Sequence, residues 1–380
     1  MISARSDVVG SLLRPPALLA AQKQLAEGLI TAAEFKRIED KAVDQAIALQ
    51  EEAGLEVVTD GEMRRRSFQS QMTAAVEGFG EHALEAFLWG KWRGGPQVGD
   101  WNLPRPSNLG VVGKLRRQRY LSAEEFTYLR ARTRRIAKIT LPSPSLWVNF
   151  WSRGRSGHVY PTLESYLNDV VEILREEVEE LVRLGATYIQ IDAPHYALLI
   201  DPQTRPFYEE QAGQAGSVER WLERAIELDN AVMSAAPGVT LGFHLCRGNQ
   251  ASRWLAQGSY EPIAAVLFRK IKAQRLLLEY DDPRSGSFEP LRHVPEDKVV
   301  VLGLVTTKTS RLETFTELVE RIREASRYVP LDRLALSPQC GFASSIIGNR
   351  ISVEDQKHKL RLVVATARSA WADFTPAAQP

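Results

Sequence analysis

The sequence has few of the residues that mark secreted or membrane-bound proteins. It contains only two cysteines in 380 residues, which cannot form a disulfide framework. No segment approaches about 18 consecutive apolar residues, the minimum for a membrane-spanning helix. The first residues also lack the basic region and long apolar stretch of a secretory signal. Together these absences predict a soluble, cytoplasmic protein that does not enter a membrane.

The chain also lacks an excess of charge of either sign. Its 48 Lys and Arg residues face 47 Asp and Glu residues, for a net charge of +1. Such a balance gives no overall field that would attract nucleic acid or an anionic membrane surface. An anionic ligand must therefore be met by local residues, and nucleic acid is excluded as an expected partner.

Short apolar runs alternate with amphipathic stretches along most of the chain, a pattern typical of a parallel sheet covered by helices. The runs are predicted strands at Asp7–Ser11, Leu55–Asp60, Ala137–Pro142, Thr187–Asp192, Val239–Cys246, Arg275–Asp281, Lys298–Val305 and Arg333–Ser337. The helices are predicted at Thr31–Ala53, Thr162–Leu184, Ser217–Ala235, Glu261–Ala273, Ser310–Tyr328 and Ser352–Trp371. Eight such strands predict a (β/α)8 TIM barrel that forms a single domain over residues 1–380.

One long segment, at about residues 67–135, interrupts this alternation and is rich in Gly, Trp, Pro and Arg. Within it, WGKWRGGPQVGDWNLPRPSN predicts an irregular hairpin and SAEEFTYLRARTRR a helix before the third strand. Because it follows the second strand, we expect this insertion to lie over the catalytic face as a lid. Its tryptophans fit a packed lid or a dimer contact equally well.

Basic residues gather in this insertion and in Arg64, Arg65 and Arg66 just before it. A run of this kind is usually a solvated surface. The alternative is a site for the anionic tail of a substrate at the mouth of the barrel.

Four residues with metal-binding side chains lie at or just after the ends of predicted strands. His244 and Cys246 are two apart, so in an extended strand both side chains point to the same face. Glu279 ends the next strand, and Cys340 follows the eighth, which closure of the barrel brings to the same rim. One imidazole, two thiolates and one carboxylate make a tetrahedral zinc site. The alternatives are a buried core histidine, an ion-paired Glu279 and inert cysteines, or a structural zinc site.

The chemistry of such a zinc site concerns sulfur. Zinc lowers the pKa of a bound thiol, so that the thiol becomes a nucleophilic thiolate at neutral pH. The sulfur can then attack an electrophilic carbon.

Six motifs, VVGSLLRP, VVTDGE, YIQIDAP, HLC, LLLEYD and SPQCG, occur in the order seen in cobalamin-independent methionine synthases. The sequence resembles this family over nearly its whole length. It is most similar to the single-barrel relatives of the catalytic C-terminal half, often labelled methionine synthase II. The resemblance implies a zinc site at His244, Cys246, Glu279 and Cys340, and a methyl group that comes from N5 of a tetrahydrofolate.

The resemblance also implies that Ser11, Glu62 and Asp192 hold the amino acid end of homocysteine. Carboxylates can pair with the α-ammonium group, and a serine hydroxyl or nearby backbone amide can receive the α-carboxylate. His195 follows Asp192 by three residues, and we expect it to line the mouth of the site.

Three positions depart from the family's motifs. The family has a YDIHSP-like stretch whose histidine is implicated in protonating the leaving folate, and this chain reads LVTTKTS with Lys308 at that position. A lysine could serve there as an acid, if its pKa were lowered, or as a contact for an anion. The family's DEP reads Asp192-Ala193-Pro194, and the second cysteine of its HxCxC stretch is Gly248.

The leading functional prediction is a zinc-dependent S-methyltransferase that converts homocysteine to methionine, with methyltetrahydrofolate as donor. The first alternative is a thiol alkyltransferase with another thiol or electrophile, like the epoxyalkane:coenzyme M transferases, in which Arg64, Arg65 and Arg66 or the insertion would bind a sulfonate. The second is a barrel that binds zinc or a thiol without catalysis. Ser11, Glu62 and Asp192 favour an amino acid thiol. A homo-oligomer is compatible with all three.

Overall fold

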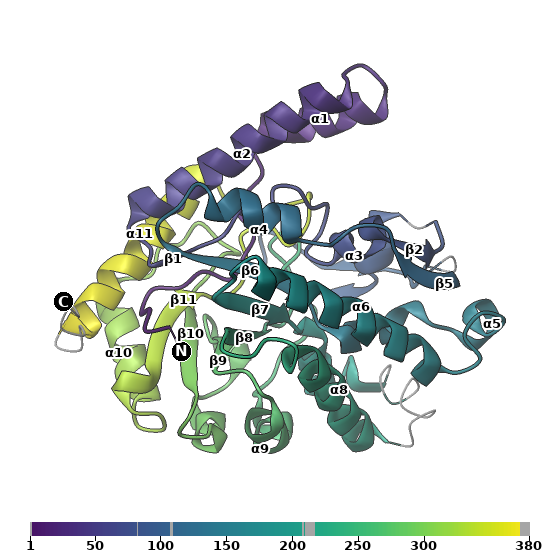
Figure 1. Ribbon diagram of the computed structural model, residues 1–380. Coiled ribbons are helices and arrows are strands. Elements are labelled where there is room, and N and C mark those ends of the chain that lie inside the picture. The colour runs from purple at the N-terminus through teal and green to yellow at the C-terminus, as the bar shows by residue number, and fades with distance from the viewer. Residues whose placement is uncertain (1, 82, 107–108, 207–208, 210–216, 373–380) are drawn as a thin grey trace.

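The computed structural model describes residues 2–372 except for 82, 107–108, 207–208 and 210–216. Seven parallel strands form one sheet that curls into a half-barrel, with helices on its outer side (Figure 1). In spatial order they are β1 (Val57–Val58), β6 (Ile136–Pro142), β7 (Tyr188–Asp192), β8 (Thr240–Leu245), β9 (Arg275–Glu279), β10 (Val299–Val305) and β11 (Leu334–Pro338). The predicted α/β class is confirmed, and the curled sheet is consistent with a TIM-like barrel.

The prediction of a regular strand at Asp7–Ser11 is wrong. The parallel bridge nearest to it is between Ser6, just before the segment, and Leu336 of β11. Within the segment the backbone oxygen of Val9 accepts a hydrogen bond from the Gln190 amide at 2.9 Å, and that of Gly10 accepts one from the Thr59 hydroxyl at 2.6 Å. Side chains thus occupy acceptors that a strand would offer to a neighbouring backbone. The segment runs beside β11 and β1 without a ladder of its own.

All six predicted helices are present, and their ends lie within a few residues of the predicted ones. They are α2 (Ala32–Ala53), α6 (Leu163–Arg183), α8 (Val218–Met233), α9 (Glu261–Lys270), α10 (Phe315–Ala325) and α11 (Val353–Ala370). The largest difference is the start of α10, which begins at Phe315 and not at Ser310 because Thr314 and Glu317 form the capping box. The sequence reading missed α1 (Pro16–Ala26), which pairs with α2 at one edge of the molecule (Figure 1).

Shorter elements complete the described part of the chain. These are α3 (Ser70–Ala75), α4 (Ala123–Arg130), α5 (Arg153–Ser156) and the 3-10 helices η1 (Leu84–Phe87), η2 (Pro144–Phe150), η3 (Pro194–Leu199), η4 (Pro283–Ser285), η5 (Glu289–His293) and η6 (Leu331–Arg333). No helix in the described ranges is long and apolar enough to cross a membrane.

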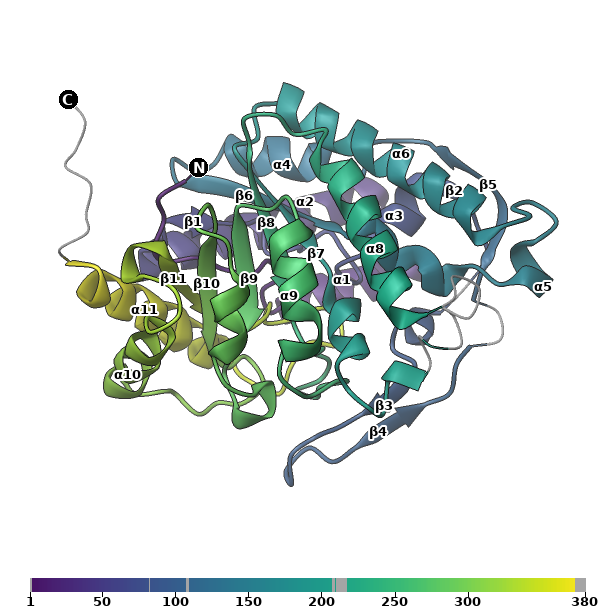
Figure 2. The same ribbon diagram turned by 90° about the horizontal axis from the view of Figure 1, so that it is seen from below.

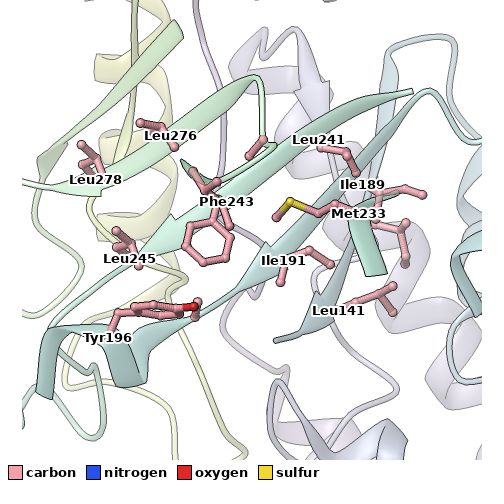
Figure 3. Close-up of a cluster of buried hydrophobic side chains, with 14 of the residues drawn as sticks. Leu141, Ile189, Ile191, Tyr196, Met233, Leu241, Phe243, Leu245, Leu276 and Leu278 are labelled. Carbon is pink, nitrogen blue, oxygen red and sulfur yellow. The ribbon is translucent and has the colours of Figure 1, made fainter. Parts of the chain in front are cut away.

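Strands β6, β7 and β8 each have one apolar and one polar face. Ile189, Ile191 and Phe243 lie in a buried apolar cluster with Met233 of α8 (Figure 3). Successive residues of a strand point to opposite faces, so the residues between them point into the barrel. The outward side chains therefore attach the helices, and the inward ones are left for the site.

The polar inward face is held together by buried hydrogen bonds. The Lys138 ammonium lies 2.8 Å from an Asp7 carboxylate oxygen and donates to the Gln190 amide oxygen at 2.7 Å. The Gln190 amide nitrogen in turn donates to Asp192 at 2.7 Å. Burial disfavours the ionised carboxylate of Asp7, but Lys138 and Arg275 outweigh it and lower its pKa. The network links the N-terminal segment to the residue that ends β7.

The insertion at residues 67–135 contains two short antiparallel pairs. β2 (Val76–Phe79) pairs with β5 (Val111–Arg117), and β3 (Gly90–Trp92) pairs with β4 (Trp101–Leu103). The β3–β4 pair projects from the rest of the molecule in Figure 2. The predicted hairpin covers β3 and β4, and its last residues, 107 and 108, lie outside the described residues. The lid role of the insertion and the single-domain organisation stay predictions.

Candidate functional site

A cavity of about 270 Å³ opens where the strands end. Seven of the nine predicted site residues line it: Ser11, Glu62, Asp192, His195, His244, Cys246 and Cys340. Trp89, Trp92 and Arg93, from β3 and the residues beside it, line it as well. Glu279 and Lys308 are not among the lining residues. The carboxyl ends of the strands thus gather most of the predicted site.

Three of the four predicted metal ligands come together. One donor atom from each of His244, Cys246 and Cys340 lies within 4.8 Å of the others, and all three residues are buried. The His244 Nδ1–H donates to the backbone oxygen of Leu277 at 3.2 Å, which leaves Nε2 buried without a hydrogen-bond partner. An oriented imidazole nitrogen and two thiol sulfurs are the donors that zinc prefers. The residues therefore fit a zinc ion.

The charges in this group favour a cation. The pKa of Cys340 is lowered well below its usual value by Cys246 and His244, whereas that of Cys246 is raised by Cys340 and by burial. Burial lowers the pKa of His244, but Cys340, Asp192 and Glu279 outweigh it and raise it. Binding of a metal would displace the protons that the group holds.

Glu279 is not part of this group of donor atoms within 4.8 Å of one another and has other partners. Its carboxylate accepts a hydrogen bond from the backbone N–H of Arg247 at 2.5 Å and pairs with Arg284. The Lys308 ammonium lies 3.3 Å from the same carboxylate. Burial disfavours ionisation, but these cations outweigh it and lower the pKa of Glu279 to about 2. Glu279 is therefore an ionised carboxylate within a cluster of cations.

Two predicted substrate contacts, Glu62 and Asp192, place carboxylates in the cavity. One oxygen of Glu62 accepts a hydrogen bond from Thr140 at 2.9 Å, and the other is buried without a partner. Glu62 has a left-handed φ of 55°, stabilised because its N–H donates to Asp60 at 2.9 Å. Burial raises the pKa of Asp192 to about 7. Both carboxylates would gain a partner in a ligand cation.

Ser11, the third predicted substrate contact, is held by the loop that carries Cys340. Its hydroxyl accepts a hydrogen bond from the backbone N–H of Ala343 at 3.3 Å. A Cβ atom at Gly341 would lie only 2.1 Å from the Ser11 hydroxyl, so only glycine permits this approach. Gly341, next to Cys340, thus sets the distance between Ser11 and the loop that carries Cys340.

His195 lines the cavity as expected and has partners that the sequence did not reveal. Its Nε2 lies 2.8 Å from the hydroxyl of Ser145, and its Nδ1 is buried without a partner. Behind Ser145 lies Asp229, a buried carboxylate on the inner side of α8. In the sequence, Asp229 occupies a position on the apolar face of an amphipathic helix, and a charged residue there indicates a buried polar contact.

The predicted solvated surface at Arg64–Arg66 is wrong for Arg65, which is 1% exposed and pairs with Glu125 at 2.7 Å. Arg64 pairs with Glu39 at 2.5 Å. Arg93, the arginine that lines the cavity, pairs with Asp201. These arginines meet carboxylates of the protein itself, because α2, α4 and the loop after η3 bring acids to them.

Gly248, which stands in place of the family's second cysteine, lies against the insertion. A Cβ atom there would lie 2.9 Å from the ring of Trp92, and its φ is 88°. A cysteine at this position would displace the tryptophan that lines the cavity.

Comparison with known proteins decides the family. Residues 5–368 match the family described as "Cobalamin-independent synthase, Catalytic domain". The chain belongs to this family. The predicted resemblance, and with it the prediction of an enzyme, is confirmed.

Individual relatives span nearly the whole chain. The Bacillus subtilis protein YxjH, described as uncharacterized, is 32% identical over 97% of this chain and 94% of its own length. A methionine synthase of Pyrococcus abyssi is 26% identical over 94% of this chain and 91% of its own. The crystal structure of a candidate vitamin-B12-independent methionine synthase from Listeria monocytogenes is 26% identical, with a TM-score of 0.70 over 98% of this chain and 99% of that one.

Proposed function

We propose that this enzyme transfers a methyl group to the sulfur of homocysteine and so forms methionine. The observation that carries the proposal is the composition of the cavity, in which one imidazole and two thiols lie beside two buried carboxylates and Ser11. The first group suits a thiol-activating zinc ion, and the second suits the ends of an amino acid. The named methionine synthase of Pyrococcus abyssi supports the same reaction.

The amino acid end of homocysteine would be held by the three predicted contacts. The free oxygen of Glu62 and the carboxylate of Asp192 would accept hydrogen bonds from the α-ammonium group. Ser11 would receive the α-carboxylate. A thiol two methylene groups from the α-carbon would then extend toward Cys246 and Cys340, which line the same cavity.

We propose that His244, Cys246 and Cys340 hold the zinc ion. When bound, zinc would lower the pKa of the substrate thiol and so supply a nucleophilic sulfur at neutral pH. Glu279 remains the proposed fourth ligand, but its carboxylate would first have to leave Arg284 or Lys308.

For Lys308 the position of the ammonium group supports one of its two predicted roles. It lies outside the cavity lining and contacts an anion, which is Glu279 of the protein itself. We propose that Lys308 positions this carboxylate. Methyltetrahydrofolate is the proposed donor.

The coenzyme M-like alternative gains no support. Arg64 and Arg65, two of the three arginines predicted to bind a sulfonate, are paired with Glu39 and Glu125, and Arg93 of the insertion is paired with Asp201. A cytoplasmic location and a homo-oligomeric state stay predictions.

The test is a product assay by mass spectrometry with purified, zinc-loaded protein and homocysteine. The methyl donor is varied among methyltetrahydrofolate, its polyglutamate form and other simple donors. Methionine formation that is lost in the Cys340→Ser variant supports the proposal. Zinc and homocysteine binding without methionine from any donor would instead indicate a binding protein and contradict it.

A further inference from the structure

A line of buried polar groups leads from the cavity to α8. It begins at His195, which is 3% exposed and whose Nδ1 has no hydrogen-bond partner. Its Nε2 lies 2.8 Å from Ser145 Oγ, and Ser145 Oγ lies 3.1 Å from Asp229 Oδ2. Asp229 is fully buried. The line therefore joins a histidine that lines the cavity to a carboxyl group that has no access to solvent.

The surroundings of Asp229 are hydroxyl groups. Ser143 donates to one of its oxygens and Tyr196 to the other, both at 2.6 Å. Among the described residues no lysine, arginine or histidine forms an ion pair with it. Burial without a cation raises the pKa of Asp229 to about 7 and lowers that of His195 to about 3. Near neutral pH Asp229 can thus hold a proton, while the imidazole is neutral and carries one.

The proton on Asp229 decides which ring nitrogen of His195 carries the imidazole proton. If Asp229 is ionised, the Ser145 hydroxyl donates to it and must accept from Nε2–H, so Nδ1 is an acceptor. If Asp229 is protonated, it can donate to Ser145, and the Ser145 hydroxyl can then donate to Nε2. In that state the ring proton sits on Nδ1, which has no partner in the described part of the protein and can donate to a ligand.

We propose that His195 protonates the leaving group of the methyl donor, and that Ser145 and Asp229 position its ring and supply the proton. The inference rests on the proposed function, with a donor whose methyl group leaves a reduced pterin nitrogen. The sulfur–carbon bond forms as the nitrogen–carbon bond breaks, and the nitrogen keeps the electron pair. It takes the proton from Nδ1, while Nε2 takes one from Ser145 and Ser145 takes one from Asp229. Asp229 is left ionised and regains its proton through Ser145 and His195, from solvent that enters the cavity before the next turnover.

The other groups of the site that could donate a proton have different roles. Lys308 is bonded to Glu279 outside the cavity lining. Asp192 has the proposed task of holding the ammonium group of homocysteine. His195 lines the cavity and is connected through Ser145 to the protonatable carboxyl group of Asp229.

Two methyl donors test this inference, because only one of them needs a proton. Iodomethane releases iodide, which leaves without protonation, whereas methyltetrahydrofolate leaves an amine. We expect His195→Ala to lower kcat with methyltetrahydrofolate by about 100-fold or more, the usual contribution of a general acid. Its rate with iodomethane, above the enzyme-free rate, should stay within about twofold and also reports that the variant folds.

Matched variants separate proton supply from simple support. Asp229→Asn cannot pass a carboxyl proton and should show the same preference for iodomethane. Ser145→Thr keeps the hydroxyl and should retain activity with both donors. Ser145→Ala lacks the hydroxyl and should lose activity with methyltetrahydrofolate but not with iodomethane. Tyr196→Phe removes one hydrogen bond to Asp229 and leaves the line intact, so it is the control.

The outcomes are distinct. Equal loss with both donors in His195→Ala would show a structural role and overturn the proposal. Turnover of the wild-type enzyme with iodomethane but with no amine-type donor would overturn it too, since no proton would then be needed. Failure of the wild-type enzyme to methylate homocysteine with either donor would refute the proposed function itself.

Discussion

Replacement of Lys138 by methionine tests whether the buried network inside the barrel supports both the fold and the site. Lys138 and Asp7 are both completely buried and lie 2.8 Å apart. The same ammonium donates to Gln190, which holds Asp192. Methionine fills a similar volume but leaves Asp7 without its nearest cation. The change therefore removes one charge and the support of a proposed substrate contact together.

The expected loss is large because a buried charge is left with fewer partners. Removal of one member of a buried pair costs about 3–5 kcal/mol of unfolding free energy. Asp7 keeps two other partners in the variant: Arg275 lies 3.3 Å from it, and the Tyr188 hydroxyl donates to it. We therefore expect a loss at the lower end of this range. The control is Lys114→Met, since Lys114 is 60% exposed and pairs with Asp169 at 3.3 Å. That exposed pair should contribute less than about 1 kcal/mol.

Urea unfolding at pH 7 measures both variants against the wild-type protein. We also expect the KM for homocysteine to rise in Lys138→Met, because Gln190 no longer fixes Asp192, while zinc content is unchanged. Asp7 has a lowered pKa in the fold, so its stabilising contribution is present above its unfolded pKa and is lost as the pH falls. The difference between wild type and Lys138→Met should therefore shrink below about pH 4. Equal unfolding free energies for Lys138→Met and Lys114→Met would refute the reasoning.

Three further variants follow from the site. Asp192→Asn should raise the KM for homocysteine about 10- to 100-fold, the value of a charge-assisted hydrogen bond. Burial raises the pKa of Asp192 from 3.8 to about 7, so the stability that this group contributes to the wild-type protein is lost as the pH rises through 7. Thermal unfolding at pH 8 should therefore find Asp192→Asn more stable than the wild type by up to about 4 kcal/mol, and at pH 5 this difference should be smaller. Gly341→Ala should lower the free energy of unfolding by about 1–3 kcal/mol and weaken homocysteine binding, because the added Cβ atom displaces Ser11. The control is Gly154→Ala, whose added Cβ atom would meet nothing within 4 Å, and calorimetry should find its stability unchanged or increased. Glu279→Gln should lower but not abolish the zinc content by elemental analysis, because His244, Cys246 and Cys340 remain. It should also lose stability, since Arg284 and Lys308 would lose their shared carboxylate; a zinc content equal to that of the wild type would contradict the ligand role of Glu279.

The sequence was sufficient for the features that depend on local pattern. Apolar alternation predicted seven strands of the sheet, and the i, i+2 spacing placed His244 and Cys246 on one face. The Asp7–Ser11 segment was misread because its apolar residues resemble a strand, while its backbone oxygens accept hydrogen bonds from side chains such as Gln190 and Thr59. Only the three-dimensional arrangement shows which partner a backbone group finds.

Electrostatic partners were the part that the sequence could not supply. Glu279 ends β9 as predicted, but Arg284 and Lys308 reach it from two different loops, and their side-chain directions leave no trace in the spacing. Arg65 reads as part of a basic run, yet Glu125, 60 residues later, buries it. The contact of His195 with Ser145 likewise joins the loops after β7 and β6.

The central claim is that His244, Cys246 and Cys340 hold a zinc ion that receives the thiol of homocysteine. X-ray absorption at the zinc edge, with and without homocysteine, tests it most directly because it counts the sulfur atoms around the metal. We predict two sulfur neighbours in the zinc-loaded enzyme and three after homocysteine is added. A sulfur count that does not change on addition of homocysteine, at a concentration that saturates binding, would contradict the account.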